Sequence, residues 1–285
     1  RQLGGTAADE ATGVAVDAGG NIYVAGSTFG TLPRSDNASA GGEDLFLLKY
    51  DSTGVLQWVR QLGTVAGDRA YGVTVGSTGD IFVAGATLGA LPGNANAGGS
   101  DIFLISYRAD GARQWIRQFG TLAFDAAQAV AADTLGGIYL SGATFGGLDG
   151  GISVGGSDLF VAKFDTSGLR LWTRQLGSVG TETSLGVAAA AQGGAYATGS
   201  TTTILEGNLA LGGEDMFLVK YDALGNQQWS DQFGTLSNEQ GRAVAVDGGG
   251  NAYVGGGSNG DLPGIINAGG EDLFLVKYDT TGTLQ

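Results

Sequence analysis

The feature that most restricts the fold of this sequence is a six-residue motif that occurs five times at a spacing of about 57 residues. The motif reads Gly-Gly, then Glu or Ser, then Asp, an apolar residue and Phe. It occurs at Gly41–Phe46, Gly98–Phe103, Gly155–Phe160, Gly212–Phe217 and Gly269–Phe274. We therefore expect one supersecondary unit copied within a single domain over residues 1–285, with repeats at approximately 1–59, 60–116, 117–173, 174–230 and 231–285.

Each repeat contains four strand-like segments that are bounded by Gly, Asp, Asn or Ser. In the first repeat these segments are Ala11–Asp17, Asn21–Thr28, Asp44–Tyr50 and Val55–Leu62. Four strands per unit are typical of a propeller blade. The sequence therefore predicts an all-β chain that folds as a β-propeller of five four-stranded blades.

The two ends of the chain resemble two parts of the same strand. Arg1–Gly4 matches Arg60–Gly63, the last part of a fourth strand, and Gly282–Gln285 matches the first part. A propeller closes when its N- and C-terminal segments share an outer strand, since closure removes the exposed sheet edges. A closed five-bladed ring is the main expectation. The alternative is five blades from a longer repeat array, because the chain begins in the middle of a repeat and without Met.

The repeat resembles a known bacterial family. The segments Gly13–Asp17, Gly20–Thr28, Gly41–Asp51 and Gly54–Trp58 are similar to the SBBP-type β-propeller repeat. This resemblance implies a secreted or cell-surface bacterial protein in which the repeats are non-catalytic modules, often within larger chains. It brings no functional residues with it.

Composition excludes several classes of function. The chain has no Cys and no His, so it offers neither disulfides and thiolate sites nor imidazole for acid–base work and metal binding. Its formal net charge of -14 would repel a phosphate backbone, so nucleic acid is not an expected partner. Insertion into a membrane is not expected either, because no apolar run approaches the roughly 20 residues that a spanning helix needs.

The segments expected to be innermost argue against an enzyme. Glycosidases of this architecture place paired carboxylates at the central channel. Here the segments carry no acid: residues 13–16, 72–75, 129–132, 186–189 and 243–246 contain only Gly, Ala, Val and Thr. We therefore expect no catalytic residues.

Apolar residues recur at equivalent positions, as packing between blades requires. Two aromatic columns are Phe46, Phe103, Phe160, Phe217 and Phe274, and Tyr23, Phe82, Tyr139, Tyr196 and Tyr253. Trp58, Trp115, Trp172 and Trp229 are expected to cover the seam to the neighbouring blade while each indole N–H finds a partner. A Lys column and a Gln column also recur, and the sequence assigns no chemistry to either.

The most uniform polar position is the Asp before the Phe column. It comprises Asp44, Asp101, Asp158, Asp215 and Asp272. We expect these carboxylates to accept backbone hydrogen bonds and to hold the preceding long loop against its blade. The alternative is a repeated calcium site, since Ca²⁺ takes 6–8 oxygen ligands and a second acidic column could supply some of them.

That second column lies in the other long connection, which is expected on the same face as the first. It comprises Asp9, Asp68, Asp125, Glu182 and Glu239. Loops on one face of a rigid scaffold are where binding residues concentrate, so these acids are the candidate binding residues of the chain.

Together these observations predict a non-catalytic structural or interaction module of an extracellular or cell-surface bacterial protein. It would present a loop-rich face to a protein partner, which includes copies of itself. One alternative is a lectin-like propeller that binds glycans, although the long loops carry few aromatic residues. Another is an adhesion module stabilised by calcium; otherwise no cofactor is expected.

Overall fold

The computed structural model describes residues 1–285 and consists almost entirely of β-strands. Its one helical element is the short 3-10 turn η1 (Leu148–Gly150). No helix in the chain has the length and apolar character needed to cross a membrane. The chain forms two compact units, of which the first comprises residues 1–132 and 166–169 and the second comprises 133–165 and 170–285.

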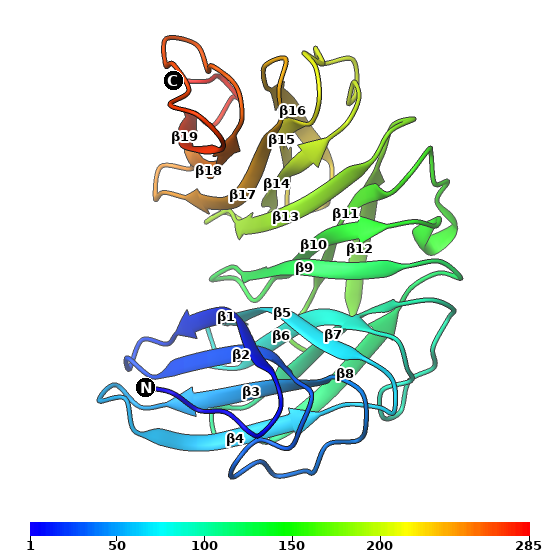
Figure 1. The fold of residues 1–285 in the computed structure, drawn as a ribbon, viewed down its shortest axis with the longest axis vertical. Helices are drawn as coiled ribbons and strands as arrows, with labels where there is room; N and C mark the ends of the chain where they lie inside the picture. The colour runs from blue at the N-terminus through cyan, green and yellow to red at the C-terminus, as the bar shows by residue number, and fades with distance from the viewer. The chain divides into compact units, whose positions relative to one another are not determined.

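The first unit contains nine strands. They are β1 (Asp9–Val16), β2 (Ile22–Thr28), β3 (Asp44–Tyr50), β4 (Leu56–Leu62), β5 (Asp68–Val75), β6 (Ile81–Thr87), β7 (Asp101–Tyr107), β8 (Arg113–Phe119) and β9 (Asp125–Ala132). Strands β1 to β4 form one antiparallel sheet in chain order, and β5 to β8 form the next (Figure 1).

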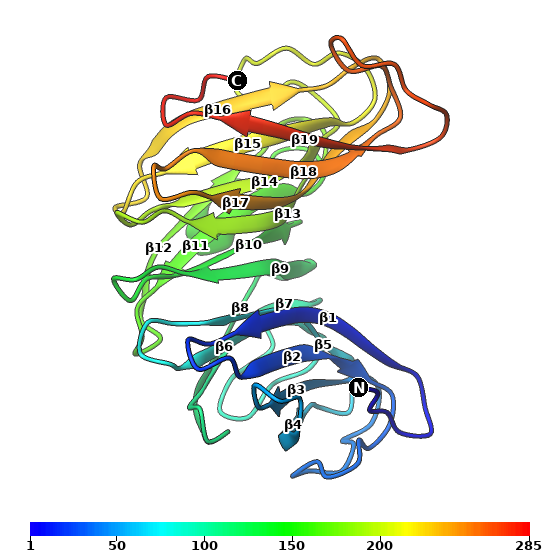
Figure 2. The same cartoon turned by 90° about the vertical axis from the view of Figure 1, so that its left-hand side faces the viewer.

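The second unit contains ten strands. They are β10 (Ile138–Thr144), β11 (Asp158–Phe164), β12 (Arg170–Leu176), β13 (Glu182–Ala189), β14 (Ala195–Thr201), β15 (Asp215–Tyr221), β16 (Gln227–Phe233), β17 (Glu239–Val246), β18 (Ala252–Ser258) and β19 (Asp272–Tyr278). Strands β10 to β12, β13 to β16 and β17 to β19 each pair antiparallel in chain order, and Figure 2 shows β17, β18 and β19 side by side.

The second strand of each repeat has a glycine where two neighbours approach. Gly85 in β6 pairs with Phe103 in β7, and a Cβ on Gly85 would lie 2.0 Å from the Arg69 carbonyl and 2.8 Å from the Phe103 ring. The carbonyl comes this close because β5 carries a bulge between Ala70 and Gly72. The phenylalanine ring covers the glycine, so the Gly and Phe columns form one packing unit across the two strands.

The core consists of packing between successive sheets inside each unit. In the first unit β5 packs against β1, β2 and β3, and a buried cluster includes Leu45, Val83 and Phe103. In the second unit β17 packs against β13, β14 and β15, around buried Met216 and Tyr278. Apolar side chains that alternate along each strand thus meet those of the next sheet, and the repeat pattern generates a buried cluster between neighbouring sheets of each unit.

The predicted all-β architecture is confirmed: each of the five repeats contributes one blade-like set of antiparallel strands, as in a five-bladed β-propeller. One detail differs, because the fifth sheet has three strands and Leu284 makes a single bridge to Tyr278 where a fourth would begin. At the other end, Arg1–Gly4 forms no strand, and Arg1 Nε donates to the Gly54 carbonyl at 2.8 Å. Closure of the ring through the two termini stays a prediction.

Candidate functional site

Two long loops of each repeat pack backbone to backbone and form what we call the loop face. These are the β2–β3 and β4–β5 loops and their counterparts. In the second repeat Gly99 N donates to the Leu122 carbonyl at 3.2 Å, and a Cβ on Gly98 would lie 2.3 Å from Leu122 Cα. Only glycine permits this approach, so the Gly-Gly of the repeated motif serves to join the two loops.

The loop face exposes apolar side chains at a repeated position. The relevant residues and their exposed fractions are Val65 (86%), Leu122 (88%), Val179 (80%) and Leu236 (87%). Each follows the first Thr or Ser of a β4–β5-type loop. Ile152, Leu209 and Ile266 on the other loops are also exposed. Exposed apolar side chains that recur at one position of ordered loops are candidates for contact with other molecules. The sequence alone does not distinguish these exposed apolar residues from the apolar residues of the core.

The first acidic column lies inside the loops. Asp44 is fully buried, and its Oδ2 accepts hydrogen bonds from Ala40 N at 3.0 Å and Gln61 Nε2 at 2.9 Å. The same pair of bonds recurs at Asp101, Asp158 and Asp215, whereas Asp272 is half-buried and accepts a bond from Ala268 N. These contacts attach the long loop to its own blade, as the structural reading of this column expects.

The recurring Gln completes this arrangement. Besides its bond to Asp44, Gln61 accepts a hydrogen bond from Leu32 N at 3.0 Å and donates to the Gly30 carbonyl at 2.8 Å. Gln118, Gln175 and Gln232 make the equivalent three contacts. The sequence showed the recurrence of this Gln but not its role, because the groups that it bridges are 17 to 31 residues away in the chain.

Replacing Gln61 with leucine is expected to lower the free energy of unfolding by about 1–3 kcal/mol, because the buried Asp44 carboxylate loses a donor while side-chain volume is preserved. Urea unfolding followed by circular dichroism measures the change. The matched control is Gln57→Leu on the same strand, an exposed site where the effect should stay within about 0.5 kcal/mol. Equal losses in the two variants would contradict this role for Gln61.

The second acidic column is buried rather than displayed on the surface. Asp68, Asp125, Glu182 and Glu239 are fully buried, and Asp9 is half-buried. Asp68 accepts hydrogen bonds from Thr64 N at 2.5 Å, from Thr64 Oγ1 at 2.9 Å and from Thr87 Oγ1. Each of these candidate binding residues is therefore a buried or half-buried residue at the end of its loop, where the following strand begins. From there its carboxylate accepts hydrogen bonds from the loop and holds the loop conformation.

The two acidic columns meet, yet they make a poor calcium site. No group of three or more His, Cys, Asp or Glu side chains is arranged to hold a metal ion. Both oxygens of Asp68 already accept hydrogen bonds, whereas Ca²⁺ requires 6–8 oxygen ligands. The residues present thus do not fit a repeated calcium centre.

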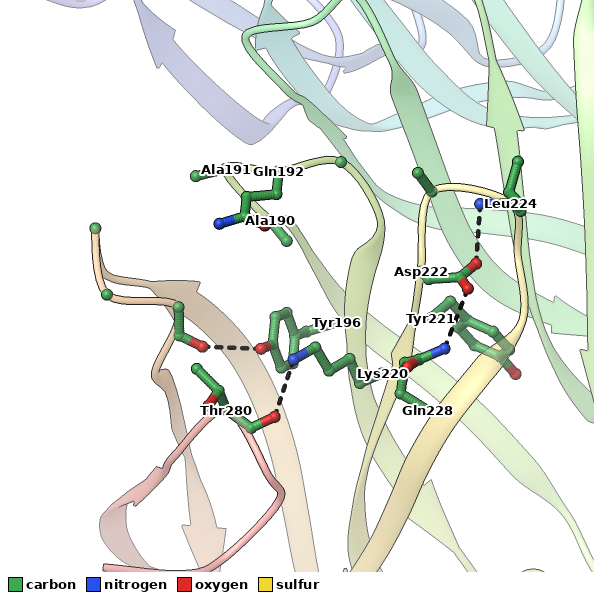
Figure 3. A pocket seen from close by; sticks show the side chains of 15 residues that line it. Ala190, Ala191, Gln192, Tyr196, Lys220, Tyr221, Asp222, Leu224, Gln228 and Thr280 are labelled. Atoms are coloured by element: carbon green, nitrogen blue, oxygen red, sulfur yellow. Dashed lines mark hydrogen bonds between the residues drawn. The ribbon is translucent and has the colours of Figure 1, made fainter.

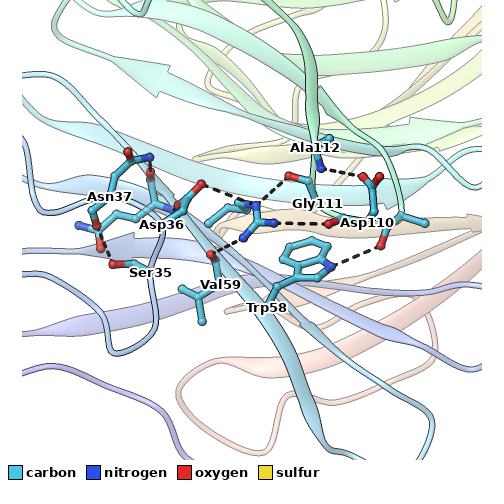
Figure 4. Close-up of polar contacts among 11 residues, drawn as sticks. Ser35, Asp36, Asn37, Trp58, Val59, Asp110, Gly111 and Ala112 are labelled. Carbon is cyan, nitrogen blue, oxygen red and sulfur yellow. Dashed lines mark hydrogen bonds and ion pairs between the residues drawn. The ribbon is translucent and has the colours of Figure 1, made fainter.

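Long side chains of the fourth strands reach the next sheet within each unit. Trp58 Nε1 donates to the Ala109 carbonyl at 3.3 Å, and Lys49 Nζ donates to the same carbonyl at 2.9 Å. Arg60 Nε donates to the Gly111 carbonyl at 2.8 Å while Asp36 lies 3.6 Å away (Figure 4). The expected seam position of the Trp column is confirmed, and the Lys column, to which the sequence assigned no chemistry, belongs to the same contact.

The hairpin turns on the opposite face carry aspartates with low pKa values. In the second unit the amide side chain and backbone N–H of Asn251 donate to Asp247, which lowers the pKa of that carboxyl to about 2. Donors within their own turns also lower the pKa of Asp51, Asp222 and Asp279. These residues are half-buried and accept bonds locally, so their role is to fix the turns.

A cavity of about 550 Å³ opens between turns of the second unit. Figure 3 shows Tyr196, Lys220, Asp222 and Gln228 around it. Lys220 Nζ donates to the Thr280 carbonyl at 3.0 Å, and Gln228 Nε2 donates to Asp222 at 3.2 Å. Tyr196 is buried and donates to the Gly250 carbonyl. Because these polar groups bond one another, the cavity presents neither an exposed aromatic platform for a sugar nor a free acid–base pair.

Parts of the chain are similar in sequence to a repeat family and to one curated protein. The SBBP β-propeller repeat matches residues 1–32 and 228–263. Regulatory protein FlaEY of Caulobacter vibrioides is 31% identical over 167 residues, which cover 53% of this chain and 18% of that protein. The chain thus spans less than a fifth of the length of this curated relative.

A solved structure shares the fold of this chain. A protein of unknown function from Bacteroides caccae has a TM-score of 0.56 at 12% identity, with 97% of this chain and 80% of that chain covered. A gluconolactonase from Xanthomonas campestris has a TM-score of 0.48 at 12% identity, with 97% and 75% covered. Likeness at this identity shows the fold alone and assigns no activity. The repeat match covers residues 1–32 and 228–263, and the five-fold recurrence of the Gly-Gly motif extends this similarity to the SBBP-type β-propeller repeat along the chain.

Proposed function

We propose that this chain is a non-catalytic protein-binding module of an extracellular or cell-surface bacterial protein, and that the loop face makes the contact. The observation that supports this most directly is the column Val65, Leu122, Val179 and Leu236, with at least 80% of each side chain exposed. The proposed location outside the cell rests on the resemblance to the SBBP-type repeat, which implies a secreted or cell-surface protein.

The construction of the loops favours a binding role. The exposed residues stand on loops whose backbones are joined by hydrogen bonds, such as Gly156 N to the Gly180 carbonyl at 2.7 Å. Loops that are already ordered lose little conformational entropy on binding, so more of the contact energy appears as affinity. The recurrent Asp, Gln, Trp and Lys side chains are engaged within the protein, which leaves the apolar column as the repeated group that faces outward.

The negative net charge of the chain indicates what kind of partner surface would bind it. The net charge is -14, and a partner surface with basic residues around an apolar centre would complement it. Self-association through this face is part of the proposal, but a second copy carries the same negative charge. Self-association should therefore strengthen with salt, whereas binding to a basic partner should weaken.

The experiment compares a loop of the loop face with a short hairpin turn. A photo-crosslinking amino acid is placed at position 122 on the loop face, or at position 224 in the β15–β16 turn, where Leu224 is also exposed. The protein captured at position 122 is then purified, and its affinity is measured for wild type, Leu122→Ser and Leu224→Ser. We expect the loop-face variant to bind at least about tenfold more weakly, with the turn variant unchanged.

Three results would contradict the proposal: equal capture at both positions, equal affinities of the two variants, or no capture together with no self-association in sedimentation velocity. Binding on a glycan array that survives Leu122→Ser would favour the lectin alternative instead. A rise in melting temperature with calcium that EDTA reverses would favour the calcium-stabilised adhesion module.

A further inference from the structure

Two buried carboxylates meet beside the same two residues of each β4–β5-type loop. Asp44 ends the β2–β3 loop and Asp68 starts β5, and both are fully buried. A Cβ on Gly63 would lie 1.9 Å from Asp44 Oδ1, while the next residue, Thr64, donates its N–H to Asp68 Oδ2 at 2.5 Å. The two acids therefore flank consecutive residues.

The second repeat shows how close the carboxylates come. The position that a Cβ on Gly120 would occupy lies 2.4 Å from Asp101 Oδ1 and 2.9 Å from Asp125 Oδ2. A side chain larger than hydrogen would displace one acid or the other. Both acids lie this close to the glycine only in the second repeat, but in four repeats the first Asp lies beside the glycine and the second acid accepts from the N–H of the next residue. The four pairs are Asp44 with Asp68, Asp101 with Asp125, Asp158 with Glu182, and Asp215 with Glu239.

One oxygen of each pair has no hydrogen-bond donor. Oδ1 of Asp44, Asp101, Asp158 and Asp215 is buried without a partner. Every other carboxylate oxygen of the first pair is bonded, because Asp44 Oδ2 accepts two bonds and Asp68 accepts three. A buried acceptor without a donor costs free energy, and its recurrence in four repeats calls for a physical explanation.

No basic side chain compensates the two charges. The groups that face Asp68 are the neutral Thr64 and Thr87, apart from Asp44 itself. Asp44 is faced by the Gln61 amide and the Ala40 backbone. The neighbouring Glu43 points to another contact, since it accepts bonds from Arg69 and Ser27. Two ionised carboxylates in such a buried place would repel each other strongly.

We propose that each pair shares one bound proton, which lies between Oδ1 of the first Asp and the carboxylate of the second acid. The hydrogen bond so formed gives the unpartnered oxygen a role and halves the buried charge. A metal ion would need more oxygen ligands than the pair offers. Burial and, to a smaller extent, the charge of Asp44 raise the pKa of Asp68, which agrees with proton uptake by the pair.

The shared proton predicts the direction in which folding stability changes with pH. A carboxyl group with a raised pKa in the folded state binds its proton more tightly when folded, so its stabilising contribution is present at low pH and is lost as pH rises. The turn aspartates have the opposite sign, because their lowered pKa values remove stability as pH falls below about 4. The stability contributed by the buried acid pairs should therefore decrease toward alkaline pH, whereas the stability contributed by the turn aspartates should decrease toward acid pH.

The test is the pH dependence of urea unfolding for wild type and Asp44→Asn. An asparagine amide at the Oδ1 position keeps the donor that we assign to the proton, while its oxygen still accepts from Ala40 and Gln61. We expect the wild-type midpoint to fall between about pH 5 and pH 9, and this fall to be smaller in Asp44→Asn. The control Asp247→Asn, in an exposed turn, should keep the wild-type slope over that range.

Parallel curves for wild type and Asp44→Asn would overturn the proposal. So would a wild-type midpoint at high pH that rises with calcium and falls with EDTA, because a metal would then supply the positive charge. If Asp44→Asn does not fold, carboxyl carbon NMR of the wild-type protein decides. We expect some buried carboxyls to titrate well above the usual range of about 4, and titration of all carboxyls within that range would refute the shared proton.

Discussion

Replacing Phe103 with alanine is expected to lower the free energy of unfolding by about 3–5 kcal/mol. Phe103 is fully buried in the cluster that joins the first two sheets, and its ring covers Gly85 on the adjacent strand. Removing the ring leaves a cavity between sheets and exposes the backbone of the β5 bulge. Urea unfolding with circular dichroism and tryptophan fluorescence measures the loss.

The control for Phe103 is Leu122→Ala on the loop face. Its side chain is apolar but exposed, so we expect a change within about 0.5 kcal/mol. A loss at Leu122 as large as that at Phe103 would mean that the loop-face column supports the fold, and it would weaken the case for a binding surface.

Replacing Gly199 with alanine is expected to lower the free energy of unfolding by about 3 kcal/mol. A Cβ at this position would lie 1.8 Å from the Thr183 carbonyl and 2.8 Å from Ser184 Cα. These are backbone atoms of the bulged strand β13, so they cannot rotate away as a flexible side chain would. The strand pair β13–β14 has to shift, and its register with β15 is disturbed.

The control for Gly199 is Gly248→Ala in the turn between β17 and β18. No atom lies within 4 Å of the Cβ that would be added at Gly248. Its effect should be near zero or slightly stabilising, because alanine restricts the unfolded chain. Similar losses in the two variants would show that chain entropy, and not the close approach of β13 and β14, sets the requirement for glycine at 199.

The boundaries of the strands followed from local sequence patterns. In the first repeat, the predicted segment Asp44–Tyr50 agrees with β3, and the other three agree with β1, β2 and β4 to within two residues at each end. The short turns could also be predicted from the sequence, because their signals act over only four or five residues. One signal is an Asp that accepts hydrogen bonds from its own turn, and the other is a Gly with positive φ, such as Gly20 at 79°.

The candidate binding residues were harder to predict. The sequence placed the acids at 68, 125, 182 and 239 in a loop between strands, where polar residues usually face water. In the structure each of them is the first residue of a strand and is buried. Their burial depends on the preceding repeat, whose Gly-Gly segment covers the loop and excludes water. For Val65 and Leu122 the opposite holds: apolar residues are usually buried, yet these two are exposed. Nothing in the neighbouring loop residues indicates that their side chains face solvent.

By itself the amino-acid sequence determined the number of repeats, the order of strands and the identity of the core columns, because alternation and turn chemistry are local and recur in register. Tertiary structure alone decided which recurrent polar groups bond each other, which acids become a buried pair, and which apolar side chains remain exposed. Those outcomes depend on how close the loops of successive repeats come, and that distance is set by packing between segments that lie far apart in the chain.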